Sequence, residues 1–347
     1  MLCVQSLFHV IPQTPLAGAE HIPASQPLTW QSWSTGQWQI NREQLSVKQF
    51  GFRPALVRLV NQLRYSFFDE HNAQITYGKD GTLFETAYQS TLCGEDFIGE
   101  EAIVQTIDSL DRFRNALIAR GKRLVILVAP NKWRTLQEKV TLNCKPKMTN
   151  YEALIPSLRN RGYAIYDGID LFQYDQQQGP AHPLHSKQGT HWSVFGAAIS
   201  VDYLRFAFAE EGIRLPKVSF ADVELSDEPR NTDKDLHDLL NIMLGPDDEE
   251  LAYPNLAFSE GDRPNVVVIG DSYYWTYYYL GIHQGLFASE SKFFYYNQSL
   301  VGTETDERIA LTDDLRKQAI ENADAVLLVM GEPSLARFGF GIFSAGI

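Results

Sequence analysis

Val266-Val-Val-Ile-Gly-Asp-Ser272 is the stretch that decides the fold of this chain of 347 residues. Its apolar half has the length of a short strand, and an aromatic helix is expected to follow over residues 273–284. A continuous apolar run, without alternation, is typical of a strand whose two faces are both buried, as in a parallel sheet. Ser272 therefore stands where a buried strand passes into a helix.

The same pattern recurs along the chain. Further apolar runs lie at 123–129, 163–166, 292–296 and 325–330, and amphipathic or apolar helices are expected over 99–120, 149–160, 192–211 and 311–322. Strands that alternate with helices predict an α/β fold with a doubly wound, mostly parallel sheet between two helical layers, as in flavodoxin-like proteins. We expect this domain to cover residues 99–347. Residues 1–98 are expected to form an extension packed on its core, with an irregular arm, a helix at 54–68 and a hairpin at 75–84.

Composition excludes several classes of protein. Hydrophobic residues make up 44% and aromatic residues 12% of the chain, which is too much for a disordered protein. The net charge of −13 argues against a nucleic-acid partner, which requires a basic surface. Residues 222–250 hold eleven acidic residues against Arg230 and Lys234, so this one insertion carries −9 of the total. The insertion is either a solvated loop or a lid beside the site.

The N-terminus and the cysteines leave alternatives open. The first twelve residues are not a complete signal peptide; they are either a strand or the start of a chain whose membrane anchor was removed. Cys93 and Cys144 either form a disulfide, leaving Cys3 over, or are two buried thiols. Their spacing does not fit zinc, and Pro183 separates His182 from His185. Nucleotide-binding glycine loops are absent from the sequence, so neither a metal nor a cofactor is expected.

Polar residues at strand ends are the candidate site, because ligands bind at the carboxyl edge of parallel sheets. Ser272 is a candidate nucleophile, with Gly270 and Asp271 on the same turn and backbone N–H groups available to an oxyanion. The alternative is that Ser272 only caps the following helix. Asn131 follows the strand at 123–129 and is either an oxyanion donor or a turn residue.

A serine nucleophile needs a base, and His191 is the candidate. It lies in Gly189-Thr-His-Trp192, where a long helix is expected to begin; the alternative is a structural histidine. Glu332 follows the last strand and either orients the base or faces solvent. Aromatic side chains near these residues either stack on a sugar ring or belong to the core. They are Trp192, Tyr273, Tyr274 and Trp275.

Four segments in this order resemble the alginate O-acetyltransferase (AlgJ/AlgX) family of SGNH-hydrolase-like proteins. They are the helix from Arg58 leading into Gly78-Lys-Asp-Gly-Thr-Leu-Phe84, Val128-Ala-Pro-Asn-Lys132, Gly189-Thr-His-Trp192 and Val268-Ile-Gly-Asp-Ser272. The resemblance implies an SGNH-like fold, with Ser272 as the residue that accepts the acyl group and His191 as the base. It also implies a periplasmic or other extracytoplasmic location, an exported polysaccharide as substrate and a membrane-bound O-acyltransferase as partner.

The chain departs from the family at one position. The family motif is Asp-x-His-Trp, in which the Asp orients the His, and Gly189 occupies that position here. A dyad can retain residual catalysis; alternatively, Glu332 or an acid of 222–250 replaces the missing carboxylate. The predicted function is therefore polysaccharide O-acetyl transfer. The alternatives are a carbohydrate acetylesterase with the same residues, or a non-catalytic glycan-binding or scaffold protein of an export complex.

Overall fold

The computed structural model describes residues 10–18, 23–68, 74–245, 249–302 and 307–344. The chain divides into two compact units, one of residues 1–73 with 236–246 and the other of residues 74–235 with 247–347. None of the helices in these described ranges is long and apolar enough to cross a membrane.

A seven-stranded sheet forms the centre of the second unit. Its strands lie in the order β10, β9, β8, β7, β11, β3 and β4. Their bounds are β3 Arg123–Ala129, β4 Ile165–Asp167, β7 Val266–Gly270, β8 Lys292–Tyr295, β9 Ser299–Val301, β10 Arg308–Ala310 and β11 Ala325–Gly331. The five strands from β8 to β4 are parallel, and β9 and β10 extend one edge in antiparallel fashion. The predicted mostly parallel α/β fold is confirmed.

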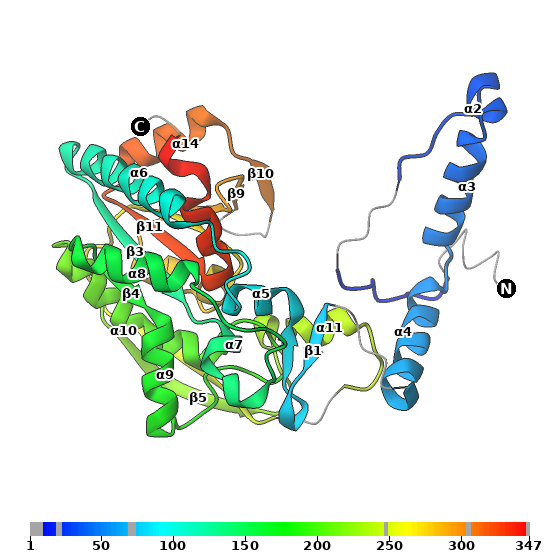
Figure 1. The fold of residues 1–347 in the computed structure, drawn as a ribbon, viewed down its shortest axis with the longest axis horizontal. Coiled ribbons are helices and arrows are strands. Elements are labelled where there is room, and N and C mark those ends of the chain that lie inside the picture. The colour runs from blue at the N-terminus through cyan, green and yellow to red at the C-terminus, as the bar shows by residue number, and fades with distance from the viewer. Residues whose placement is uncertain (1–9, 19–22, 69–73, 246–248, 303–306, 345–347) are drawn as a thin grey trace. The chain divides into compact units, whose positions relative to one another are not determined.

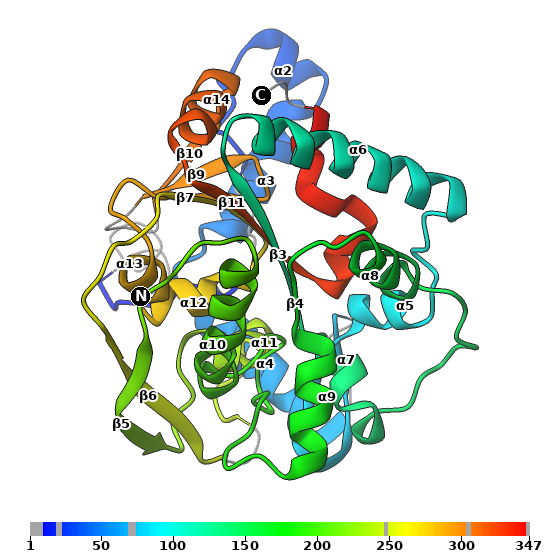
Figure 2. The same cartoon turned by 90° about the vertical axis from the view of Figure 1, so that its left-hand side faces the viewer.

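Helices cover both faces of this sheet (Figure 2). Alternate residues of each central strand point to opposite sides, so that Val125 and Leu127 join one apolar core while Leu124 and Ile126 join the other. The first core includes α9 (Gly168–Gln178), α10 (Val194–Glu210), α12 (Tyr274–Tyr279) and α13 (Ile282–Leu286). The second includes α6 (Glu100–Ala119), α8 (Asn150–Asn160), α14 (Asp313–Asn322) and the 3-10 segment η6 (Glu332–Ser344).

Helix ends follow local chemistry. The helix expected over 192–211 begins at Val194, because the Ser193 hydroxyl accepts a hydrogen bond from the N–H of Gly196 and caps it. The helix expected over 273–284 is divided into α12 and α13 at Gly281, whose φ of 70° lies in the left-handed region. The predicted hairpin is confirmed as β1 (Ile75–Tyr77) paired with β2 (Leu83–Glu85).

The acidic insertion has more structure than a solvated loop. It contains most of β5 (Val218–Ser226), which pairs with β6 (Leu251–Phe258) in an antiparallel ladder that the sequence patterns did not predict. Between these strands lie the 3-10 turn η5 (Asn231–Lys234) and the helix α11 (Asp235–Leu240). Residues 231–235, which we call the strap, end at the boundary between the two units.

The first unit contains α2 (Trp30–Ser34), α3 (Gln37–Lys48) and α4 (Arg53–Leu63), drawn in blue in Figure 1. The region expected to be an irregular arm therefore holds two helices. Asn61 donates a hydrogen bond to the Leu240 carbonyl at 2.8 Å within this unit. The hairpin lies in the second unit, so the compact units divide after Ala73; a domain boundary at 98/99 stays a proposal. Cys3 and residues 1–9 of the expected N-terminal strand lie outside the described residues, and residues 10–12 do not form a strand.

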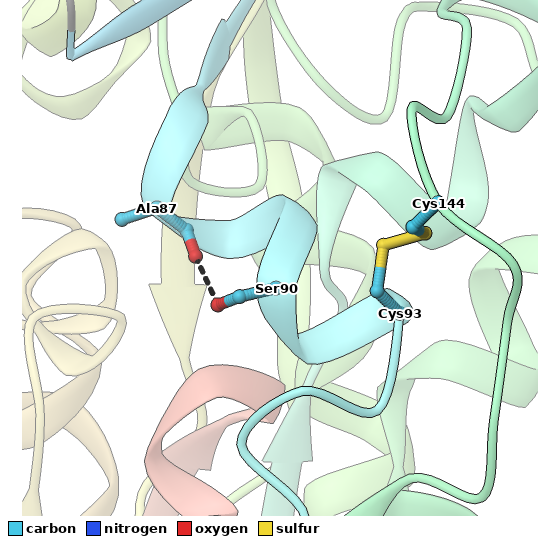
Figure 3. The surroundings of a disulfide bond; sticks show 4 residues. All are labelled: Ala87, Ser90, Cys93 and Cys144. Atoms are coloured by element: carbon cyan, nitrogen blue, oxygen red, sulfur yellow. Dashed lines mark hydrogen bonds between the residues drawn. A yellow bond between two sulfur atoms is a disulfide. The ribbon is translucent and has the colours of Figure 1, made fainter.

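A disulfide joins Cys93 to Cys144, with their Cα atoms 6.0 Å apart (Figure 3). Cys93 ends the short helix α5 (Gln89–Leu92), and Cys144 lies in the loop that leads to α8. Of the two alternatives left open by the sequence, the structure has the disulfide.

Candidate active site

Ser272 lies on the turn between β7 and α12, and its neighbour Asp271 fixes that turn. The buried Asp271 carboxylate accepts hydrogen bonds from the N–H of Tyr273 at 3.1 Å, the N–H of Gly331 at 2.7 Å and the hydroxyl of Ser334 at 2.6 Å. Burial raises the pKa of Asp271, while these bonds oppose that rise. Asp271 therefore ties the turn to the end of β11 and acts as a structural support.

Gly270 allows close packing at the same turn. A Cβ atom at this position would lie 3.3 Å from the Cβ atoms of both Tyr274 and Val329, which is tighter than ordinary contact. Ser272 itself is no helix cap, because α12 begins at Tyr274 and no side chain caps it. Among the described residues, the backbone N–H of Ser272 has no hydrogen-bond acceptor.

His191 lies between Ser272 and a carboxylate. Its Nε2 is 2.9 Å from Ser272 Oγ, and its Nδ1 is hydrogen-bonded to Asp235 Oδ2. The other oxygen of Asp235 accepts a hydrogen bond from the Thr190 N–H at 2.8 Å. Serine, histidine and aspartate thus form one hydrogen-bonded chain, which is the geometry of a catalytic triad.

The charges around His191 favour its protonated form. Burial opposes the charged imidazolium, but the Asp235 carboxylate and its hydrogen bond outweigh burial, with smaller contributions from Asp271 and Glu85. The pKa of His191 is consequently raised above its ordinary value.

A buried lysine holds the loop that carries His191. Lys132, at the start of α7 (Lys132–Thr135), is 1% exposed. Its Nζ lies 2.7 Å from the Leu83 carbonyl, 2.6 Å from that of Ser186 and 2.7 Å from that of Gly189. The lysine therefore joins the hairpin to the loop 186–189.

A second support runs from the same helix. The hydroxyl of Thr135 lies 2.8 Å from His185 Nε2, and His185 Nδ1 lies 3.1 Å from the His191 carbonyl. Burial, with the nearby Lys132 charge, lowers the pKa of His185 to about 3, so this imidazole is neutral. Nδ1 then donates to the carbonyl and Nε2 accepts from Thr135, which fixes the backbone at His191.

Glu332 and Asn131, two predicted support residues, each have hydrogen-bond partners other than His191. Glu332 is fully buried and forms a bidentate ion pair with Arg134, whose Nε lies 2.9 and 3.0 Å from the two carboxylate oxygens. It neither faces solvent nor contacts His191, so both interpretations of Glu332 were wrong. Asn131 is buried, and its Oδ1 caps α7 by accepting from the Trp133 N–H at 3.1 Å. A role for the Asn131 side chain in an oxyanion hole stays a prediction.

The four aromatic residues expected to stack on a sugar belong to the core. Trp192, Tyr273, Tyr274 and Trp275 are all at most 6% exposed. The Trp192 ring stacks on Tyr277 at 4.8 Å, and its Nε1 donates to the Tyr273 carbonyl at 3.2 Å. The expectation of sugar stacking by these four was wrong, and the alternative of core packing is what the structure has.

The sequence did not identify Asp235 as the carboxylate that contacts His191. An acid from residues 222–250 was one of two alternatives, but eleven acidic residues of that segment were equally eligible. The sequence assigned no function to Lys132 or His185. A lysine that follows a strand and a histidine in a loop are both common, so neither residue stood out. Within the described residues no group of three His, Cys, Asp or Glu side chains has a geometry that could hold a metal ion.

Comparison with known proteins gives the family. Residues 75–286 match the SGNH hydrolase-like domain of the acetyltransferase AlgX. The chain belongs to this family. The matched region of the AlgX-like domain contains the hairpin, Lys132, His191, Asp235 and Ser272.

Individual relatives are distant. The probable alginate O-acetylase AlgJ of Pseudomonas syringae pv. tomato is 24% identical over 179 residues, which are 51% of this chain and 44% of that protein. This AlgX-family chain thus spans less than half of that curated relative. The structure of Bacillus cereus PatB1 matches 77% of this chain and 98% of its own with a TM-score of 0.50 at 10% identity. The O-acetyltransferase domain of Pseudomonas putida AlgJ matches 78% of this chain and 99% of its own with a TM-score of 0.49 at 16% identity.

Proposed function

We propose that this protein transfers an acetyl group to hydroxyl groups of an exported polysaccharide, with Ser272 as nucleophile and His191 as base. The observation that carries the proposal is the Ser272–His191–Asp235 chain, in which Nε2 lies 2.9 Å from Oγ. Membership of the AlgX-like acetyltransferase family supports acetyl as the acyl group. The name of the relative, an alginate O-acetylase, supports a polysaccharide as acceptor.

In the first half-reaction, Ser272 Oγ attacks the carbonyl carbon of the acetyl donor while its proton passes to His191 Nε2. The tetrahedral intermediate collapses, the donor's leaving group departs with that proton, and an acetyl-serine ester remains. The Ser272 N–H is available to hydrogen-bond the developing oxyanion. Asp235 holds the imidazole in the tautomer that accepts at Nε2 and stabilises the imidazolium.

In the second half-reaction, a sugar hydroxyl gives its proton to His191 Nε2 and attacks the acetyl carbonyl. The serine leaves with the proton from His191, and the acetyl group is now an ester of the sugar. An esterase differs only in that water takes the place of the sugar hydroxyl. The non-catalytic alternative was supported by the missing acid at Gly189, and the carboxylate of Asp235 on His191 weakens that support.

The compartment and the partner are parts of the same proposal. The Cys93–Cys144 disulfide supports an oxidising, extracytoplasmic compartment, because disulfides are rare in the cytoplasm. A membrane-bound O-acyltransferase that supplies the acetyl group remains a proposal drawn from the family resemblance.

Product analysis separates transfer from hydrolysis. Wild type and Ser272→Ala are incubated with p-nitrophenyl acetate and oligosaccharides of mannuronate or of neutral sugars, and acetylated products are identified by mass spectrometry. We expect acetylated oligosaccharide with wild type and none with Ser272→Ala. Acetate alone, with every acceptor, would favour the esterase, and equal products from both proteins would contradict the nucleophile.

A further inference from the structure

We propose that glycine at position 189 is the steric condition under which the strap, residues 231–235, presents Asp235 to His191. In this account Asp235 is a positioning residue that acts through His191. Gly189 then leaves the room that the strap backbone occupies. The proposal rests on the proposed function and specifies which segment supplies the acid for that same site.

The space beside Gly189 is filled by the strap backbone. A Cβ atom at position 189 would lie 2.3 Å from the Thr232 carbonyl oxygen and 3.0 Å from the carbonyl carbon of Asp233. The Ser186 hydroxyl would be 2.8 Å away. Backbone atoms cannot rotate aside as a side chain can, so any residue other than glycine displaces the strap.

Hydrogen bonds hold the strap against the loop of His191. The Ser186 hydroxyl donates to the Asp233 carbonyl at 2.6 Å and accepts from the Gly189 N–H at 2.9 Å. The Thr190 N–H donates to Asp235 Oδ1 at 2.8 Å. The strap and the His191 loop are therefore joined on both sides of Gly189, and a shift at 189 is transmitted to Asp235.

The strap also contacts the helix that follows the nucleophile. The hydroxyls of Thr232 and Thr276 are 3.0 Å apart, and Thr276 lies in α12. The strap thus contacts both His191, through Asp235, and the helix α12 that follows Ser272, through Thr232. This position suits a segment that aligns the two reacting side chains.

Other carboxylates near His191 have hydrogen-bond partners other than its Nδ1. The carboxylate of Glu85, which also favours the protonated imidazole, is hydrogen-bonded to the side chains of Thr190 and Tyr88. Asp233, two residues before Asp235, accepts from the Val194 N–H at 3.2 Å. Glu332 is paired with Arg134 and Asp271 with the turn of Ser272. The acid at Nδ1 of His191 is Asp235.

The pKa of His191 is measured by NMR titration in the Ser272→Ala protein, a measurement that does not depend on catalysis. The His191 signal is assigned by its disappearance in the His191→Gln variant. Adding Asp235→Asn removes a charge and keeps the shape, and we expect a lower His191 pKa. In the protein with Ser272 intact, Asp235→Asn is expected to slow acetylation by p-nitrophenyl acetate about 10³- to 10⁴-fold. Asp238→Asn, a half-exposed acid of the same helix, is the matched control and is expected to change neither quantity.

The steric half is tested by Gly189→Asp combined with Asp235→Ala. We expect no recovery of the rate or of the His191 pKa, because a side chain at position 189 displaces the strap and, through its hydrogen bonds, the loop that carries His191. Recovery of both to wild-type values would overturn the steric claim, and an unchanged His191 pKa in Asp235→Asn would overturn the role of Asp235. If Ser272→Ala hydrolyses the ester as fast as wild type, the proposed function fails, but the titration result still decides the inference.

Discussion

The turn that carries Ser272 and the strap that carries Asp235 both contact His191, but different parts of the structure hold them in place. Ser272 follows directly on a central strand, and Asp271 ties its turn to the neighbouring strand β11. Asp235 comes from an insertion, 44 residues after His191 and outside the parallel sheet. Ser272 is therefore positioned by the fold itself, whereas Asp235 is positioned by a few hydrogen bonds to a loop.

This difference determines how the Ser272 turn and the strap tolerate substitutions. The Ser272 turn is built into strands that are almost fully buried, so substitutions there affect the core. The strap depends on glycine at 189 and on the hydroxyl of Ser186.

The largest expected effect comes from removing the residue that joins the two regions. His191→Ala takes away the imidazole whose Nε2 contacts Ser272 Oγ. We expect acetylation of the enzyme by p-nitrophenyl acetate to slow by about 10⁶-fold, as measured by the burst of p-nitrophenol. A loss similar to that of Asp235→Asn would mean that His191 is not the base.

Lys132→Met tests whether the strap alone positions the loop of His191. The variant leaves the carbonyls of Leu83, Ser186 and Gly189 without their donor, at about 1–3 kcal/mol for each buried group. We expect the free energy of unfolding to fall by about 4 kcal/mol and the acetylation rate to fall with it. Unchanged stability and rate would show that the strap suffices.

The same lysine predicts a pH dependence. Burial lowers the pKa of Lys132 to about 7, against the opposing charges of Glu249, Asp235 and Asp233. Between this value and the ordinary lysine pKa the unfolded chain binds a proton that the folded protein has lost, so stability rises with pH. Urea unfolding across this range should show the stability difference between wild type and Lys132→Met growing with pH. A difference that shrinks would contradict the lowered pKa.

A smaller effect, on stability alone, is expected at the disulfide. Cys93 and Cys144 close a loop of 51 residues, and neither touches Ser272, His191 or Asp235. Cys93→Ser should lower the free energy of unfolding by about 2–4 kcal/mol and leave the acetylation rate below the unfolding transition unchanged. A matching fall in rate would show that the site depends on this loop as well.

Local patterns predicted the parts of the site that follow strands. Apolar runs located β3, β7, β8 and β11, and the end of β7 located Ser272. The sequence could not select Asp235 from eleven acids, because its contact with His191 depends on the path of the strap. It also could not show that Glu332 pairs with Arg134 or that four aromatic residues are buried, since both depend on how distant segments pack. Gly189 was interpreted as a missing acid because sequence alone does not reveal which atoms fill the space beside a glycine.

The most direct test of the central claim is to find the acetyl group on the protein. Wild type and Ser272→Ala are treated with p-nitrophenyl acetate, quenched in acid, and compared by intact mass and peptide mapping. We expect one acetyl group per wild-type molecule, on the peptide that contains Ser272, and none on that peptide in the variant. Equal acetylation of the two proteins, or a stable acetyl group at another residue only, would contradict the account.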